Sequence, residues 1–198
     1  TDIFEKISPD LVLVHGDTST TLAGALAAFY RKIPVGHVEA GLRTYDRYSP
    51  FPEEMNRRLV SQLATLHFAP TETNADNLRR ENIRENLFVT GNTVIDALST
   101  TVRPDYVFRD KTLRGIDFEH KRVLLVTAHR RENYGEPLHH IMRALRRLAA
   151  DYPDVHIVYP LHLSPVVRDT AAAVLAGAEG VSLIEPVMVD EMHNLMSR

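Results

Sequence analysis

Hydrophobic and polar stretches alternate along the chain in the manner of repeated strand–helix units. Short apolar runs predict strands at residues 11–14, 34–38, 67–69, 87–89, 123–126, 155–159 and 181–184. Between them, helices are predicted at 19–30, 53–66, 72–81, 92–101, 138–150, 165–175 and 189–196. The helix at 53–66 has apolar residues at three- and four-residue spacing, the helix at 19–30 is rich in Ala and Leu, and the helix at 72–81 is polar. Such repeats are typical of an α/β fold in which helices pack against parallel sheets.

The alternation lapses once, between residues 102 and 121, where nine charged side chains occur without an apolar period. We expect a linker there, between the C-terminal part of a first Rossmann-like domain at 1–101 and the N-terminal part of a second at 122–198. The aliphatic run at 123–126 is typical of a strand buried on both faces. Doubly wound domains usually have about five or six strands, so both domains are expected to be truncated, and the chain need not be active by itself.

Composition excludes several classes of function. Lys and Arg number 23 against 26 Asp and Glu, giving a net charge of −3, which argues against a nucleic-acid partner. The absence of cysteine excludes disulfides, thiolate metal sites and a cysteine nucleophile, and fits a reducing, cytoplasmic location. The longest apolar runs are about half of the ~20 residues that cross a bilayer, and no signal peptide is visible. We therefore expect no membrane partner.

Polar residues follow the first two predicted strands, at the edge where parallel sheets bind ligands. Asp17 and Thr18 lie between the first strand and its helix, and Asp17 has two interpretations: a functional carboxylate or a helix N-cap. Glu39 follows the second strand. His15, Asp17, His37 and Glu39 together have ligand types that suit zinc or manganese, but their spacing matches no recognised metal motif, so no metal site is expected and buried structural histidines are favoured.

A third carboxylate appears where the segment PFPEE opens the helix at 53–66. Glu53 and Glu54 suit the positive end of the helix dipole, and their i,i+4 spacing to Arg57 and Arg58 predicts two stabilising pairs. Helix stability does not explain why a third acid follows Asp17 and Glu39 at another strand-to-helix junction. Three acids at such junctions favour proton transfer at a sugar or similar polyol.

Basic residues follow the strands of the second half. His129, Arg130 and Arg131 come after the run at 123–126, and His162 comes after the run at 155–159. Arginine forks next to a histidine are typical of a phosphate clamp with an acid for the leaving group. A solvated surface charge run is the alternative interpretation.

Six of these motifs, in order, resemble the bacterial non-hydrolysing UDP-N-acetylglucosamine 2-epimerases. They are HGDT at 15–18, HVEAGLRT at 37–44, PFPEEMNRR at 50–58, TETNADNLRREN at 71–82, GNTVIDAL at 91–98 and AHRREN at 128–133. The resemblance implies two Rossmann-like domains in the glycosyltransferase-B arrangement. It also implies a cytoplasmic homodimer that interconverts UDP-N-acetylglucosamine and UDP-N-acetylmannosamine, without metal or nicotinamide, for cell-surface polysaccharide synthesis.

The resemblance also implies roles for individual residues. Four match the family's catalytic residues: Asp17, Glu39, Glu53 and His129. Arg130 and His162 match positions that bind a second UDP-N-acetylglucosamine as activator, and Glu53 lies between the two ligands. Further contacts with the substrate are expected from Thr18, Arg57 and Arg131.

The chemistry implied is anti elimination of UDP to a 2-acetamidoglucal, followed by re-addition with the C2 proton delivered from the opposite face. Such a reaction needs proton carriers on both faces of the sugar and cationic or hydrogen-bonding groups at the departing diphosphate. Three alternatives remain open at this point: a hydrolysing epimerase, a retaining glycosyltransferase of similar architecture, and a non-catalytic sugar-nucleotide sensor.

Overall fold

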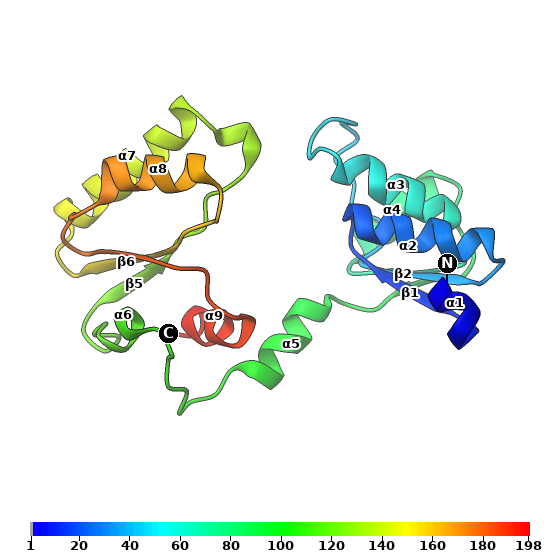
Figure 1. Ribbon diagram of the computed structural model, residues 1–198, viewed down its shortest axis with the longest axis horizontal. Coiled ribbons are helices and arrows are strands. Elements are labelled where there is room, and N and C mark those ends of the chain that lie inside the picture. The colour runs from blue at the N-terminus through cyan, green and yellow to red at the C-terminus, as the bar shows by residue number, and fades with distance from the viewer. Residues whose placement is uncertain (1) are drawn as a thin grey trace. The chain divides into compact units, whose positions relative to one another are not determined.

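The chain divides into two compact units, residues 1–97 (unit 1) and 98–198 (unit 2), each built on a parallel sheet. The computed structural model describes residues 2–198 (Figure 1). The elements of unit 1 are α1 (Asp2–Ile7), β1 (Val12–His15), α2 (Ser19–Tyr30), β2 (Val35–Val38), α3 (Glu53–Leu63), β3 (Leu66–Ala69), α4 (Glu72–Arg80) and β4 (Leu87–Val89). Helix α5 (Thr93–Thr101) crosses the boundary between the units.

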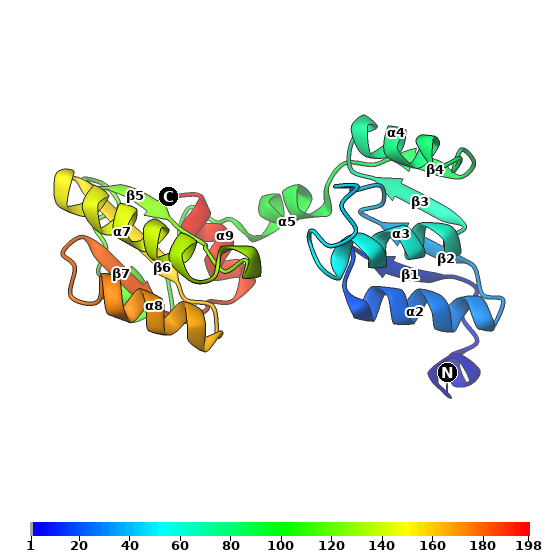
Figure 2. The ribbon, with the colours of Figure 1, turned by 90° about the horizontal axis from the view of Figure 1, so that it is seen from above.

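The sheet of unit 1 has the strand order β1-β2-β3-β4, with every neighbouring pair parallel. Each strand is followed by its next neighbour, and right-handed crossovers then place α2, α3 and α4 on one face of the sheet (Figures 1 and 2). Val14, Ala28 and Val60 are buried between that face and the helices. On the other face the rings of Phe68 and Phe88 stack with centroids 5.8 Å apart.

The sheet of unit 2 has the order β5-β6-β7, again parallel, and helices cover both of its faces (Figure 1). Its elements are α6 (Lys111–Arg114), β5 (Arg122–Leu125), the short 3₁₀ helix η1 (Arg131–Asn133), α7 (Glu136–Asp151), β6 (Val155–Pro160), α8 (Pro165–Leu175), β7 (Val181–Ile184) and α9 (Val189–Met196). Tyr159 packs with α7 and α8, whereas its neighbour Val158 packs with α6 and α9. The alternation of side chains along β6 therefore joins two cores.

The expectation that residues 123–126 form a strand buried on both faces is wrong. Strand β5 lies at the edge of its sheet, and Leu124 is 39% exposed. The fully enclosed strand is β6, whose residues from Ile157 to Pro160 are all buried. An aliphatic run alone does not distinguish an edge strand from a central one, because the difference depends on which strands pair.

Residues 102–121, where we expected a linker, form part of unit 2. Phe108 and Leu113 are buried in a cluster with Leu195 of α9. The backbone N–H groups of Arg109 and Asp110 donate to Glu191 Oε1, at 2.6 and 2.9 Å. The charged residues of this segment thus surround two apolar anchors whose spacing follows no helical or strand period.

The other expected elements are present, several with the predicted bounds. Helices at 19–30, 165–175 and 189–196 begin and end as the sequence indicates. Helix α3 ends at Leu63 rather than at residue 66, because Ala64 adopts an extended backbone and Leu66 begins β3. Within residues 2–198, no helix combines the length and apolar character that a membrane crossing requires.

Candidate active site

The turn between β1 and α2 holds Asp17 at the carboxyl edge of the first sheet. Gly16 has φ +70°, a conformation that glycine adopts without strain. Thr18 caps α2, because its Oγ1 accepts a hydrogen bond from the Thr21 N–H at 3.2 Å. The interpretation of Asp17 as the helix cap is therefore wrong, and its carboxylate is directed elsewhere.

Asp17 faces a guanidinium and two further carboxylates of α3. Arg57 NH2 lies 3.2 Å from Asp17 Oδ2, and the Asp17 side chain is 26% exposed. Burial raises the pKa of Asp17; Arg57 opposes this, and the charges of Glu53 and Glu54 add to it. A carboxyl group with a raised pKa holds its proton more readily than an ordinary aspartate, which suits a group that exchanges protons.

Glu39 reaches the same turn from the neighbouring strand. It directly follows β2, with φ +65°, an uncommon conformation for a residue other than glycine. Its Oε2 lies 3.2 Å from His15 Nε2 and 3.6 Å from the position that a Cβ on Gly16 would occupy. The structure thus brings Glu39 against the turn that carries Asp17, because β1 and β2 are paired in parallel and end together.

The two glutamates of PFPEE have different environments. Glu53 is half-buried, whereas Glu54 is fully buried and accepts hydrogen bonds from the N–H groups of Thr44 and Tyr45, at 3.0 and 3.1 Å. Arg57 Nε lies 3.6 Å from Glu54 Oε2. The expected side-chain pairing of Glu54 with Arg58 is wrong, because burial turns Glu54 toward the preceding loop and Arg57.

Arg57 does not form the expected i,i+4 pair with the Glu53 side chain. Its Nε donates instead to the backbone carbonyl of Glu53, at 3.4 Å, and its guanidinium spans the distance between buried Glu54 and Asp17. Arg57 is itself buried. It therefore links the structural carboxylate of α3 to the carboxylate of the turn.

The four residues considered for a metal site are engaged within the fold. His15 pairs with Glu39, Asp17 pairs with Arg57, and His37 binds a backbone carbonyl. His37 Nε2 lies 2.8 Å from the carbonyl of Gly16, and His67 Nε2 lies 3.0 Å from the carbonyl of Ser61. Across residues 2–198, no three His, Cys, Asp or Glu side chains gather closely enough to hold a metal ion. The buried histidines thus bind backbone carbonyls, as the structural interpretation expects.

In unit 2 the candidate residues follow β5 and β6. The rings of His129 and His162 stack with centroids 5.0 Å apart. Ser164 N donates to His162 Nδ1 at 3.0 Å, Arg130 lies 3.9 Å from Glu132, and Arg131 begins η1. All four candidates are exposed. Unit 2 thus brings together the histidines of two motifs that are 33 residues apart.

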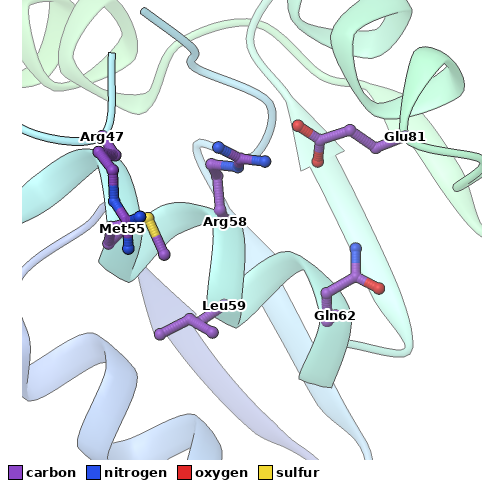
Figure 3. Close-up of a pocket in the computed structure, with 6 residues that line it drawn as sticks. All are labelled: Arg47, Met55, Arg58, Leu59, Gln62 and Glu81. Carbon is purple, nitrogen blue, oxygen red and sulfur yellow. The ribbon is translucent and has the colours of Figure 1, made fainter. Parts of the chain in front are cut away.

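A separate hollow of about 450 Å³ lies beside α3 (Figure 3). Met55, Leu59 and Gln62 of the helix line it with Arg47, and Arg58 and Glu81 point toward one another across it. Buried Arg43 holds Glu81 with two hydrogen bonds, of 2.8 and 2.7 Å, which lower the pKa of that carboxyl. The lining includes none of the carboxylates predicted from the sequence.

Three residues near Asp17 and Glu39 were missed as site residues by sequence reasoning. Glu54 positions Arg57, Asn56 Nδ2 donates to the Asp17 carbonyl at 2.9 Å, and His15 pairs with Glu39. Glu54 and Asn56 have a signal in the sequence, since a helix that packs its apolar side on a sheet seldom buries an acid and an amide. The corresponding signal for His15 is its position two residues before Asp17.

Comparison with known proteins gives a consistent assignment. The family described as UDP-N-acetylglucosamine 2-epimerase matches residues 1–198. The UDP-N-acetylglucosamine 2-epimerase of Bacillus subtilis is 52% identical over 198 residues, which are 100% of this chain and 51% of that protein. The chain spans about half the length of the curated relatives it matches.

Solved structures agree with the fold. The UDP-GlcNAc 2-epimerase of Neisseria meningitidis bound to UDP-GlcNAc is 49% identical, with a TM-score of 0.91 over 99% of this chain and 54% of that one. The S. aureus MnaA–UDP co-structure is also 49% identical, with a TM-score of 0.90 over 98% of this chain and 52% of that one. The expected α/β fold class with Rossmann-like parallel sheets is confirmed. By its sequence over all 198 residues and by its fold, the chain belongs to the UDP-N-acetylglucosamine 2-epimerase family.

Proposed function

We propose that the complete gene product containing this chain interconverts UDP-N-acetylglucosamine and UDP-N-acetylmannosamine. The observation that carries the proposal is the grouping of Asp17, Glu39 and Glu53 with Arg57 around one turn, in a chain of this family. Relatives that bind UDP-GlcNAc or UDP support the substrate class. The product would serve cell-surface polysaccharide synthesis.

The proposed reaction is an elimination followed by an addition. The C1–O bond to UDP breaks and UDP leaves with the bonding pair, so positive character at C1 acidifies the C2 hydrogen. A carboxylate removes that proton, and the electron pair of the broken C2–H bond forms the C1–C2 double bond of 2-acetamidoglucal. UDP then adds back to C1 while a proton reaches C2 on the opposite face, giving the epimer.

This reaction needs acidic groups on two sides of the sugar ring. Glu53 and one of Asp17 or Glu39 would be the acid and the base. The raised pKa of Asp17, caused mainly by burial, supports a role in proton exchange. Arg57 would contact the substrate while holding Asp17, and the Thr18 hydroxyl, which caps α2, lies at the entrance of the same turn.

Residues of unit 2 would serve the departing nucleotide. His129 would hold or protonate the leaving diphosphate, where negative charge develops, and Arg131 would bind it. Arg130 and His162 would take a second UDP-N-acetylglucosamine as activator. The stacking of His129 on His162, with ring centroids 5.0 Å apart, supports a link between those two roles because the two side chains are in contact. We also propose that the protein acts as a homodimer.

Product analysis by NMR tests the proposal. UDP-N-acetylglucosamine incubated with the complete protein is expected to yield UDP-N-acetylmannosamine until equilibrium is reached from either side. Free N-acetylmannosamine with UDP would show a hydrolysing enzyme instead. Saturable binding without turnover would show a sensor, and sugar transfer to an acceptor would show a glycosyltransferase.

A further inference from the structure

We infer that Thr21, His37 and Asn56 form a three-point clamp that fixes the turn carrying Asp17. Three consecutive backbone carbonyls, of residues 15, 16 and 17, each accept a hydrogen bond from a side chain of a different element. Thr21 Oγ1 of α2 donates to the first at 2.6 Å, and Asn56 Nδ2 of α3 donates to the third at 2.9 Å. His37 Nε2 of β2 binds the middle one at 2.8 Å.

The clamp is built from buried side chains. His37 is fully buried, and Thr21 and Asn56 are each 6% exposed. A turn whose central residue is Gly16, with φ +70°, has wide conformational freedom by itself. Donors from α2, β2 and α3 remove that freedom, so the direction of the Asp17 side chain is set by three elements that the fold already holds together.

His37 performs this task in one tautomer. A carbonyl oxygen only accepts, so Nε2 carries the hydrogen. Nδ1 is then the unprotonated nitrogen, and it is buried without a hydrogen-bond partner. Burial lowers the pKa of His37 most; the Gly16 carbonyl opposes this, and His67, Arg43 and His15 add to the lowering. The middle point of the clamp is therefore a neutral histidine that donates from a single fixed nitrogen.

The clamp makes His37 a positioning residue that acts through Asp17. This part of the inference rests on the proposed function, because it assigns Asp17 a proton-transfer role. Misplacement of a reacting group by about 1 Å costs on the order of 100-fold in rate, with binding of the rest of the substrate little changed. The expected signature is a lower kcat at nearly constant KM.

Two leucine variants give a matched test in the complete protein. His37→Leu removes the donor to the turn, whereas His67→Leu removes a neighbouring buried histidine that donates to Ser61 instead. We expect His37→Leu to lower kcat by about tenfold or more, with KM changed by less than about threefold, and His67→Leu to keep kcat per folded molecule. His37→Gln, which carries an N–H near the Nε2 position, is expected to recover most of the loss.

Two NMR measurements on the unmodified chain keep the inference testable if a variant does not fold. Nitrogen spectra should show His37 protonated at Nε2 and bare at Nδ1, and the amide of Gly16, which donates to the Val38 carbonyl, should exchange slowly. Substitution Asn56→Asp, which places an acceptor against the Asp17 carbonyl, should speed that exchange. A His37 ring protonated at Nδ1 alone, unchanged kcat in a folded His37→Leu protein, or equal losses in both leucine variants would overturn the clamp.

These measurements separate the clamp from the proposed reaction. Absence of epimerase activity in the wild-type protein would contradict the proposed function. The His37 tautomer and the amide exchange would still support or overturn the clamp. Conversely, full epimerase activity together with a His37 ring protonated at Nδ1 alone would contradict the clamp but not the proposed function.

Discussion

The guanidinium of Arg57 lies 3.2 Å from the carboxylate of Asp17, and both side chains are largely shielded from water. Their attraction lowers the pKa of Asp17, yet burial outweighs it, so the net shift is upward. A cationic partner thus holds the acid in place without lowering its pKa below the ordinary value. This balance leads to the first prediction.

Asp17→Asn is expected to stabilise the chain at neutral pH. Because the pKa of Asp17 is raised in the folded state, the folded protein binds the proton more tightly than the unfolded chain does. Stability is therefore lost as the pH rises from the unfolded pKa through the raised folded pKa. The midpoint of thermal unfolding should be higher for the variant at pH 7 and equal to wild type below the ordinary pKa of 3.8. A lower midpoint at pH 7 would contradict the raised pKa.

The three carboxylates of the site should each be needed for turnover. Asp17→Asn, Glu39→Gln and Glu53→Gln are expected to lower kcat by a factor of about 10² or more, as loss of a general acid or base does. Exposed Glu72 of α4 provides the control, and Glu72→Gln should leave kcat unchanged. Steady-state kinetics of the complete protein measures this, and wild-type rates in all three variants would refute the assignment.

Substitutions of the adjacent residues Glu53 and Glu54 should have different effects, on turnover and on stability respectively. Glu54→Ala leaves Arg57 and two backbone N–H groups without their buried partner, a loss worth about 3–5 kcal/mol of unfolding free energy. Glu53→Ala should abolish turnover but change stability little, because its side chain is only half-buried. Urea unfolding of both variants tests the contrast, and equal destabilisation would show that Glu54 is not the structural member of the pair.

His37 should make stability depend on pH. Burial lowers its pKa to about 4 in the folded state, from an ordinary value of 6.5. The unfolded chain then binds the proton more readily, so this stabilisation is complete above pH 6.5 and is lost as the pH falls toward 4. A shift of this size corresponds to at most about 3 kcal/mol.

Urea unfolding between these pH values measures the effect. His37→Gln should flatten the dependence of the unfolding free energy on pH, although the pKa of His67 is also lowered by burial and leaves a smaller slope. An unchanged slope in the variant would show that burial does not lower the pKa of His37.

The sequence predicts the helices and strands well, because an alternating α/β pattern depends on local periodicity. The carboxylates that we propose for the chemistry, Asp17, Glu39 and Glu53, can be selected from the sequence because each follows a strand or opens a helix. The sequence does not predict how they are held. The partners of Arg57, the burial of Glu54 and the three donors to the turn depend on contacts between separate elements. The packing of the segment at 102–121 cannot be predicted for the same reason, since Phe108 is buried only because α9 packs on it.

In the proposed reaction, acidic groups around the Asp17 turn remove a hydrogen from C2 of the sugar and return one. Incubation of UDP-N-acetylglucosamine with the complete protein in D₂O tests it most directly. We expect deuterium at C2 of both UDP-sugars, and a strongly reduced rate of exchange in the Asp17→Asn and Glu53→Gln proteins. Conversion to the epimer with the original hydrogen retained at C2 would contradict it.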